Sequence, residues 1–411
     1  MKRVFKDGKT LANCKIYQML AKNGKRKHLS FHTPGHKVKG WDITELSYSD
    51  NLSAPKGCIL EAEEDIAKIL GAKKSFILTD GSTAGVLSML YAVKLLGAKS
   101  VAFPLQSHKS VWNGCALLGL TPLAYPEKAE QADAVLLTSP SYYGKVENLA
   151  GVRKYCVEKE KILLVDGAHG GHLHFDKELY AGSFADMWVD GVHKSLPAFT
   201  QGAVVSARDE KFAEALKKGV DCFRTTSPSY PIMASVEYAV KYPQNAAIEK
   251  EARAYAESEQ RVCVNEDWTK LLCRFGVKAF EAEKYLERKG IFAEFCDGEY
   301  ICFYLSPATR LRDFRVLKKH LKKAFEKYPF EANQELQRIP APCLYEDCGI
   351  EQVDLDKAIG RVCAENCGLF PPCTPLLCVG DRVDSESVRR LQNADNVYGV
   401  YQGKISVFEE K

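Results

Sequence analysis

The sequence has no long apolar segment and no large excess of charge. Nowhere in its 411 residues do about 18 apolar side chains follow one another, so no membrane span is predicted. The formal net charge is only +4 and no long block of Lys or Arg occurs, which argues against a nucleic-acid partner. The charges of residues 1–6 are followed by no apolar core, so a secretory signal is not expected.

Metal-binding cysteine spacings are also missing, although cysteine itself is plentiful. None of the 15 cysteines forms a Cys-x2-Cys pair. The six cysteines between residues 343 and 378 match no zinc or iron–sulfur spacing. In a long chain without a secretory signal, reduced thiols and a cytoplasmic location are expected. His169, His172 and His174 form a histidine cluster, but their loop has another explanation below, so no metal site is predicted.

What the sequence does contain is an alternation of short apolar runs with helical stretches. Hydrophobic residues make up 46% and charged residues 27%, which predicts a globular chain of two or three domains. Between residues 74 and 206, helical stretches separate several of the apolar runs. This pattern predicts an α/β fold with a mostly parallel sheet that is buried on both faces. The expected strands are 76–78, 101–103, 134–137, 162–165 and 187–189, and the expected helices are 84–96, 108–119 and 148–159.

The flanking regions have different patterns. Short helices are expected at 10–23 and at 60–70, the second ending at Gly71, and a long polar helical segment at 229–259. Residues 268–327 predict a smaller α+β domain, followed by a proline-rich part with one helix near 353–366. The predicted domains are 1–240, 241–330 and 331–411. Within the smaller domain, the expected strands are 269–273, 291–293 and 300–304, and the expected helices are 278–289 and 311–327.

Three short segments, each after its own predicted strand, carry groups suited to one cofactor. Gly81, Ser82 and Thr83 open a helix, where free N–H groups and hydroxyls can hold a phosphate; on its own, an ordinary helix cap explains them as well. Asp166 ends a buried strand and could hold a protonated nitrogen, or could be a turn residue. Lys194 follows another buried strand, where partial burial favours Schiff-base chemistry, whereas most lysines are simply on the surface.

Pyridoxal phosphate needs all three of these groups. It requires a lysine for its aldehyde, a carboxylate for its pyridine nitrogen, and N–H groups at a helix start for its phosphate. The order of phosphate turn, aspartate and lysine, with Lys194 following Asp166 by 28 residues, is common to the fold-type I enzymes that use this cofactor.

Within that group the sequence resembles the bacterial Orn/Lys/Arg decarboxylases, in a short form without the N-terminal wing domain. The resemblance extends from about residue 10 to about residue 382 and rests on eight segments. These are Phe31–Lys37, Thr79–Thr83, Ser107–Ser110, Thr138–Gly144, Val165–Gly170, His193–Leu196, Thr225–Tyr230 and Phe370–Pro375.

The resemblance implies a fold-type I, aspartate aminotransferase-like large domain, and assigns roles to single residues. Lys194 would bind the aldehyde, Asp166 the pyridine nitrogen, and His193 would be a phosphate ligand or proton donor. The implied catalytic residues are Lys194, His193, Asp166 and His108, the last of which would stack on the ring. The implied cofactor-binding residues are Gly81, Ser82, Thr83, His108, Asp166, Ala168, His169, His193, Lys194 and Thr226. Thr226 would reach the phosphate of a neighbouring subunit, so a homodimer or higher homo-oligomer is expected.

Several positions depart from the family's pattern. Asp80 stands where Asn is usual, Gly167 where Glu is often found, Gly191 where a hydroxyl is usual, and Cys373 where Gly is usual. These departures leave the core chemistry in place and put the choice of substrate in doubt.

The implied reaction is α-decarboxylation of a basic amino acid, with arginine favoured over lysine and ornithine. Glu365 and Asp381 are candidates for binding the distal cation on resemblance alone, and a solvated acid is the competing interpretation of each. Another reaction of the same fold, such as transamination or carbon–sulfur cleavage, is an alternative, although no arginine clamp for a retained carboxylate can be identified. A paralogue that binds the cofactor without turnover is a further alternative.

Overall fold

The computed structural model describes residues 5, 7–38, 40–332, 349–370 and 375–409. The chain forms two compact units, each considered by itself. The first consists of Met1–Pro104, Ser110–Glu249 and Leu305–Ala308. The second consists of Leu105–Lys109, Lys250–Tyr304 and Thr309–Lys411.

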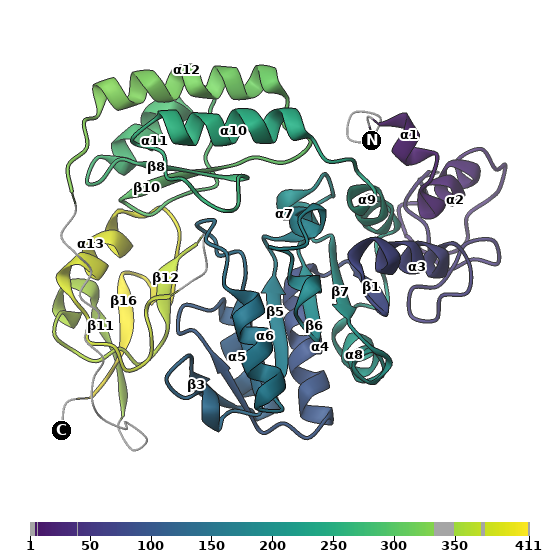
Figure 1. Cartoon of the computed structure of the whole chain (residues 1–411), viewed down its shortest axis with the longest axis horizontal. Coiled ribbons are helices and arrows are strands. Elements are labelled where there is room, and N and C mark those ends of the chain that lie inside the picture. Colours follow the sequence, from purple (N-terminus) through teal and green to yellow (C-terminus); the bar gives the residue numbers. More distant parts are fainter. Residues whose placement is uncertain (1–4, 6, 39, 333–348, 371–374, 410–411) are drawn as a thin grey trace. The chain divides into compact units, whose positions relative to one another are not determined.

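A seven-stranded sheet with the order β1-β7-β6-β5-β4-β2-β3 forms the centre of the first unit (Figure 1). Strands β6, β5, β4, β2 and β3 run parallel, and β7 is antiparallel to both β6 and β1. Six strands therefore point the same way, which confirms the predicted mostly parallel sheet. The strands are β1 (Lys74–Leu78), β2 (Ser100–Phe103), β3 (Thr121–Ala124), β4 (Ala134–Thr138), β5 (Ile162–Gly167), β6 (Met187–Asp190) and β7 (Ala203–Ala207).

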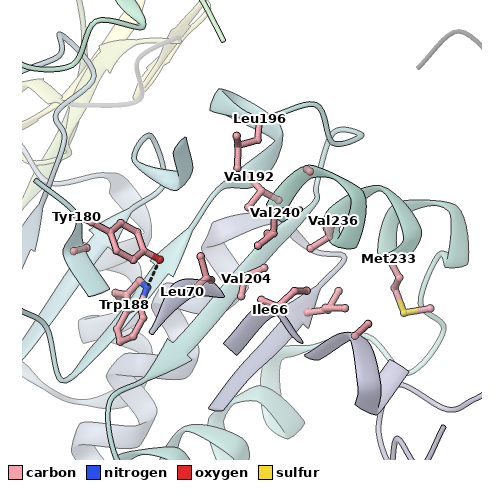
Figure 2. Close-up of a cluster of buried hydrophobic side chains, with 14 of the residues drawn as sticks. Ile66, Leu70, Tyr180, Trp188, Val192, Leu196, Val204, Met233, Val236 and Val240 are labelled. Atoms are coloured by element: carbon pink, nitrogen blue, oxygen red, sulfur yellow. Dashed lines mark hydrogen bonds between the residues drawn. The ribbon is translucent and has the colours of Figure 1, made fainter. Parts of the chain in front are cut away.

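Helices bury both faces of this sheet, because alternate residues of each strand point to opposite sides. On one face, α3 (Cys58–Leu70), α7 (Val192–Ser195) and α9 (Tyr230–Val240) cover Trp188 and Val204 (Figure 2). On the other face, α4 (Gly81–Leu95), α5 (Lys109–Leu118) and α8 (Glu210–Phe223) enclose Met187 and Val205. Helix α6 (Leu149–Glu158) contributes Leu149 and Cys156 to the first of these cores. Both faces are therefore inaccessible to a ligand, and the ends of the strands are the part of the sheet that a ligand can reach.

Two predicted helical segments each form a pair of helices. Residues 10–23 give α1 (Gly8–Leu11) and α2 (Lys15–Asn23), whose first N–H groups donate to the buried carboxylate of Glu237 at 2.6 and 2.9 Å. The helical character predicted for 229–259 is confirmed, but the prediction of one long polar segment is wrong. The segment comprises the almost fully buried α9 and a separate α10 (Ala246–Ser258), with Pro243 between them.

The second unit includes the predicted α+β arrangement. Strand β10 (Tyr300–Tyr304) lies between β8 (Lys270–Arg274) and β9 (Phe295–Cys296), all antiparallel, with α11 (Ala279–Glu287) packed on β10 and on α12 (Leu311–Lys327). The strand predicted at 291–293 is wrong, because the pairing with β10 begins only at Phe295.

Two small sheets make up the C-terminal part of the second unit (Figure 1). Strands β11 (Ile350–Asp354), β16 (Lys404–Phe408) and β15 (Val400–Tyr401) form one; β13 (Pro375–Leu377), β12 (Cys367–Leu369) and β14 (Val397–Tyr398) form the other. The α-helix predicted near 353–366 is wrong: residues 350–354 pair with β16, and only a short 3-10 turn, Leu355–Ala358, follows. Helix α13 (Ser385–Asn393) adds Val388 and Leu391 to the core here.

Among the described residues, no helix combines the length and the apolar character that crossing a bilayer would require.

Candidate active site

The three predicted segments lie at one edge of the large sheet. The phosphate turn follows β1, Asp166 lies near the end of β5, and Lys194 lies in α7, directly after β6. Because β1, β5 and β6 run in the same direction, their carboxyl ends meet at this edge. Ligand sites of open α/β sheets form at such strand ends.

The phosphate turn is built for an anion. Gly81 has a φ of +74°, which favours glycine, and its N–H donates to the carbonyl of Gln201 at 2.9 Å. The N–H groups of the next residues begin α4 and have no partner within the helix. Ser82 Oγ is buried, and it meets no hydrogen-bond partner in the part of the chain that the structure describes. A buried hydroxyl of this kind calls for a ligand oxygen, which a phosphate would supply.

Asp80, one of the departures, does not cap α4. Its carboxylate instead accepts a hydrogen bond from the backbone N–H of Thr225 at 3.3 Å. The residue thus joins the phosphate turn to the loop that begins at Thr225, which contains the predicted Thr226. Asp80 has a structural explanation that does not require contact with the phosphate.

Asp166 is buried at 3% exposure, and its carboxylate accepts a hydrogen bond from the N–H of Ala168 at 3.1 Å. Burial raises the pKa of Asp166 above its ordinary value, and the nearby charge of Lys194 counteracts the rise. A protonated pyridine nitrogen would provide a further opposite charge and stabilise the ionised form. The surroundings of Asp166 thus fit the predicted role.

Lys194 is in contact with two aromatic side chains. Its Nζ lies 3.1 Å from Nε2 of His169 and 5.6 Å from the ring centre of Tyr142. The two rings meet edge to face, with centroids 4.4 Å apart. His169 was predicted from the sequence, whereas Tyr142 was only part of a matched segment with no role assigned. An aromatic residue just after β4, at the same edge as β5, was the signal for it.

His193 is held by the backbone just before β7. Its Nδ1 lies 3.0 Å from the carbonyl oxygen of Gly202, and its backbone N–H donates to the same oxygen at 3.1 Å. This double contact fixes the orientation of the ring. Because Nε2 of His169 lies within hydrogen-bond distance of Lys194 Nζ, His169 is the histidine placed to exchange a proton with the lysine.

The departures at 167 and 191 have a steric explanation. A Cβ at Gly191 would lie 2.4 Å from the carbonyl oxygen of Ala168 and 2.7 Å from Ser82 Oγ. A Cβ at Gly167 would lie 2.9 Å from the carbonyl oxygen of Val189 and 3.2 Å from Oδ1 of Asp190. Neither position accepts a side chain without movement of the backbone, so the glycines allow β5, β6 and α4 to approach closely.

Asp190 is a fully buried acid next to Gly167. Its Oδ2 accepts hydrogen bonds from the Tyr180 hydroxyl at 2.7 Å and from Trp188 Nε1 at 3.1 Å. Burial raises the pKa of Asp190 to about 7, against the lowering effect of these two donors. Because Trp188 and Tyr180 belong to the core in Figure 2, Asp190 lies on the opposite side of the sheet from Val189 and α4.

Other predicted residues lie apart from this cluster. His108 belongs to the segment 105–109 of the second unit, so its stacking on the cofactor stays a prediction. Thr226 is exposed on the loop between α8 and α9, and its contact with a partner subunit also stays a prediction. His174 is bound through Nδ1 to the carbonyl oxygen of Gly171 at 2.7 Å, and burial lowers its pKa to about 4.

A cavity of about 610 Å³ lies elsewhere in the first unit, between α3, β1 and α8. Its wall includes the buried Arg224, whose guanidinium donates to the carbonyl oxygens of Ile77 and Leu52 and lies 3.8 Å from Glu63. These groups already satisfy one another, so the cavity offers none of the chemistry found at the sheet edge.

Comparison with known proteins identifies the family. The family model described as "Orn/Lys/Arg decarboxylase, major domain" matches residues 40–130 and 124–263, which is more than half of the chain. The uncharacterized protein YaaO of Bacillus subtilis is 26% identical, covering 97% of this chain and 98% of its own length. An arginine decarboxylase of the same organism is 25% identical, covering 91% and 92%.

A solved structure of similar fold is the constitutive lysine decarboxylase of Escherichia coli, with a TM-score of 0.68 at 18% identity. The match covers 97% of this chain and 82% of that one. At this identity the likeness establishes the fold alone, and the fold is that of the fold-type I enzymes.

The residues at the sheet edge fit the cofactor of that fold. Ser82 offers a buried hydroxyl at a helix start, Asp166 a carboxylate in need of a cation, and Lys194 an amine beside them. The chain belongs to the Orn/Lys/Arg decarboxylase family, and it is a decarboxylase of fold type I whose cofactor is pyridoxal phosphate.

Proposed function

We propose that the protein removes the α-carboxylate of arginine and releases agmatine and carbon dioxide. The observation that carries the proposal is the grouping of Lys194, His169 and the buried Asp166 at the edge that also presents Ser82. When bound, pyridoxal phosphate supplies an electron sink for the pair of electrons left by the departing carboxylate.

Each residue of the group has one task in this proposal. Lys194 holds the aldehyde carbon, and Asp166 keeps the pyridine nitrogen protonated. Ser82, Thr83 and the N–H groups that begin α4 bind the phosphate, with Gly81 providing the turn. Ala168 would contact the ring of the cofactor, and His108 would stack on it. His193 would be a phosphate ligand whose Nδ1 is held by the carbonyl oxygen of Gly202.

Proton transfer falls to Lys194 and His169. Their nitrogen atoms are 3.1 Å apart, which is within reach for direct exchange. Tyr142 closes one side of the pair and keeps water from the amine. After the carboxylate has left, Lys194 returns a proton to Cα, and His169 restores the proton to Lys194.

Arginine is preferred to lysine and ornithine for two reasons. Several relatives that cover about nine tenths of the chain are named arginine decarboxylases. Of the two candidate acids, Glu365 is only partly buried and its carboxylate accepts one hydrogen bond, from Ser406 at 2.9 Å, whereas Asp381 is buried and bound to the N–H of Cys378 at 2.8 Å. Glu365 is therefore the better candidate for a bidentate contact with a guanidinium.

The proposal includes an assembly of at least two copies, with Thr226 of one copy near the phosphate held by the other. Its support is that Thr226 is exposed on the loop between α8 and α9.

Incubation of the purified protein and pyridoxal phosphate with arginine, lysine or ornithine, separately, tests the reaction. Mass spectrometry would detect agmatine, cadaverine or putrescine. We expect agmatine with the wild type and none with Lys194→Ala, while Lys217→Ala on the surface of α8 keeps full activity. Cadaverine or putrescine alone would overturn the choice of arginine and leave decarboxylation intact.

A second readout separates binding from turnover. Borohydride reduction of the yellow protein should attach the cofactor to the peptide that contains Lys194. If the cofactor is attached there but no amine is formed from any substrate, the protein is a cofactor-binding paralogue or catalyses another reaction of this fold. Attachment to a different lysine would contradict the assignment of Lys194.

A further inference from the structure

Two buried cysteines of the second unit, on either side of Glu365 in the sequence, lie close together. The Sγ atoms of Cys363 and Cys367 are 3.9 Å apart, and both side chains are completely buried. Cys363 pairs with Val407 of β16 through an isolated bridge, and Cys367 begins β12. The pair thus stands where the two small C-terminal sheets meet.

Their surroundings hold both sulfurs in place. Each thiol lies near the carbonyl oxygen of Glu365, at 2.8 Å from Cys363 and 3.3 Å from Cys367. Cys367 is also 3.2 Å from the carbonyl oxygen of Gly399. A Cβ at Gly399 would lie 2.9 Å from the Cys367 sulfur, so glycine at this position leaves the sulfur just enough space.

A disulfide requires sulfurs at about 2.05 Å, so the pair must close by nearly 2 Å. Rotation of the two side chains toward one another can provide this, because both backbones are already fixed by strand pairing on either side of the short turn 364–366. The movement would cost the weak S–H···O contacts of the two thiols with Glu365 and Gly399, and no backbone hydrogen bond of either sheet.

We propose that Cys363 and Cys367 are a redox-active dithiol that low-molecular-weight disulfides convert into an intramolecular disulfide. One protein thiolate attacks a sulfur of the small disulfide, forms a mixed disulfide, and releases one small thiolate. The second protein sulfur then displaces the other small thiol. Two protein thiols are oxidised, one small disulfide is reduced to two thiols, and the two S–H protons pass to the thiols released.

The electrostatics of the pair support the first step. The hydrogen bond between the two thiols lowers the pKa of Cys363, and the same hydrogen bond together with burial raises the pKa of Cys367. Cys363 is accordingly the sulfur that ionises first and attacks first.

Burial sets the rate of the reaction. Residues 364–366 are partly exposed, so opening of this turn is the direct route for a small disulfide. Oxidation of the pair should therefore be slower than modification of the exposed Cys222, which serves as an internal reference. Because the disulfide closes a loop of only a few residues, it should change the unfolding temperature little.

The full-length protein, incubated in buffers with a range of oxidised to reduced glutathione ratios and then alkylated, provides the test. Cleavage after Arg361 and after Glu365 separates Cys363 from Cys367, so their peptides stay joined only through a disulfide. We expect the joined peptides in oxidising buffer, with the loss of alkylation at both Cys363 and Cys367, and their separation on return to reducing buffer.

Variants make the assignment specific. Cys363→Ser and Cys367→Ser should each abolish the joined peptides, whereas Cys378→Ser, which alters another buried cysteine of the same unit, should leave them unchanged. Alkylation of both cysteines in the most oxidising buffer, while Cys222 carries glutathione, would overturn the proposal. So would a disulfide from either cysteine to a third one. Neither readout depends on the decarboxylase activity.

Discussion

At the scale of single residues, Gly191 has two possible explanations, because it stands where the family usually has a hydroxyl. On the family pattern alone, Gly191 is a lost phosphate contact. In the structure it is the residue that lets the chain after β6 approach Ala168 and Ser82, with no room for a Cβ. The two explanations predict opposite effects of restoring a hydroxyl.

We expect Gly191→Ser to weaken binding of pyridoxal phosphate and to lower the free energy of unfolding by about 1–3 kcal/mol, the usual cost of overpacking. Cofactor titration by absorbance and urea unfolding would measure the two effects. Gly8→Ser, at a position with open space around it, is the matched control and should change stability by less than about 0.5 kcal/mol. Tighter cofactor binding by Gly191→Ser would favour the lost-contact explanation instead.

Asp190 gives a prediction about pH. Its pKa is about 7 in the folded protein, against 3.8 for an ordinary aspartate, so the folded state retains a proton that the unfolded state has lost across this range. Stability therefore decreases as the pH rises from about 4 to about 7, by at most about 1.4 kcal/mol per pH unit from this group.

Replacement of Asp190 by Asn removes this titration and leaves an oxygen to accept from Tyr180 and Trp188. As the pH is raised from 5 to 8, the free energy of unfolding of Asp190→Asn should increase relative to that of the wild type, as measured by urea unfolding. Asp395→Asn, at an exposed site, should show no such change. Equal differences from the wild type at both pH values would show that Asp190 is ionised throughout.

At the scale of elements, one buried arginine connects three segments. Arg224, at the end of α8, donates to the carbonyl oxygens of Ile77 in β1 and Leu52 in the loop before α3, and it lies beside Glu63 of α3. Both charged side chains are buried, at 2% and 8% exposure. Removal of one partner of a buried pair leaves the other charge unpaired.

We expect Arg224→Met to lower the free energy of unfolding by about 3–5 kcal/mol. Lys217→Met on the same helix disrupts only a surface pair with Asp221 and should cost at most about 1 kcal/mol. Chemical unfolding followed by circular dichroism would compare the two variants. A double variant Glu63→Gln, Arg224→Met should recover part of the loss, and no recovery would contradict the assignment of the loss to the unpaired acid.

At the scale of the whole molecule, the proposed assembly makes complementation testable. If Thr226 serves the site of a neighbouring copy, one site takes Lys194 from one chain and Thr226 from the other. Lys194→Ala and Thr226→Asp then alter residues that different chains contribute to the same site. A mixed dimer then contains one site with both residues intact. Co-expression of the two variants, each inactive alone, should restore roughly a quarter of the wild-type activity, since half of random dimers are mixed.

Light scattering would establish that both variants assemble. If they form mixed oligomers without any recovery of activity, Thr226 serves its own chain or does not contact the phosphate at all. Thr225→Asp in the same loop is not a suitable control, because its N–H is bound to Asp80. Ser227→Asp, the other exposed residue of the loop, is the better comparison.

The sequence by itself determined the α/β architecture and the proximity of Asp166 and Lys194. Continuous apolar strands must be buried on both faces, and the carboxyl ends of parallel strands meet at one edge. The position of Asp166 and Lys194 after such strands was therefore enough to predict that they come together. Local patterns gave the wrong secondary structure where pairing with a distant strand determines it. Residues 350–354, for example, pair with β16 instead of starting a helix.

Only the tertiary structure decided what surrounds those residues. It placed His169 and Tyr142 against Lys194, turned His193 toward Gly202, and filled the space beside Gly167 with the carboxylate of Asp190. It also brought the sulfurs of Cys363 and Cys367 together at the junction of two sheets. These contacts depend on side-chain directions and on close approach between elements distant in sequence, which a linear pattern of residue types does not encode.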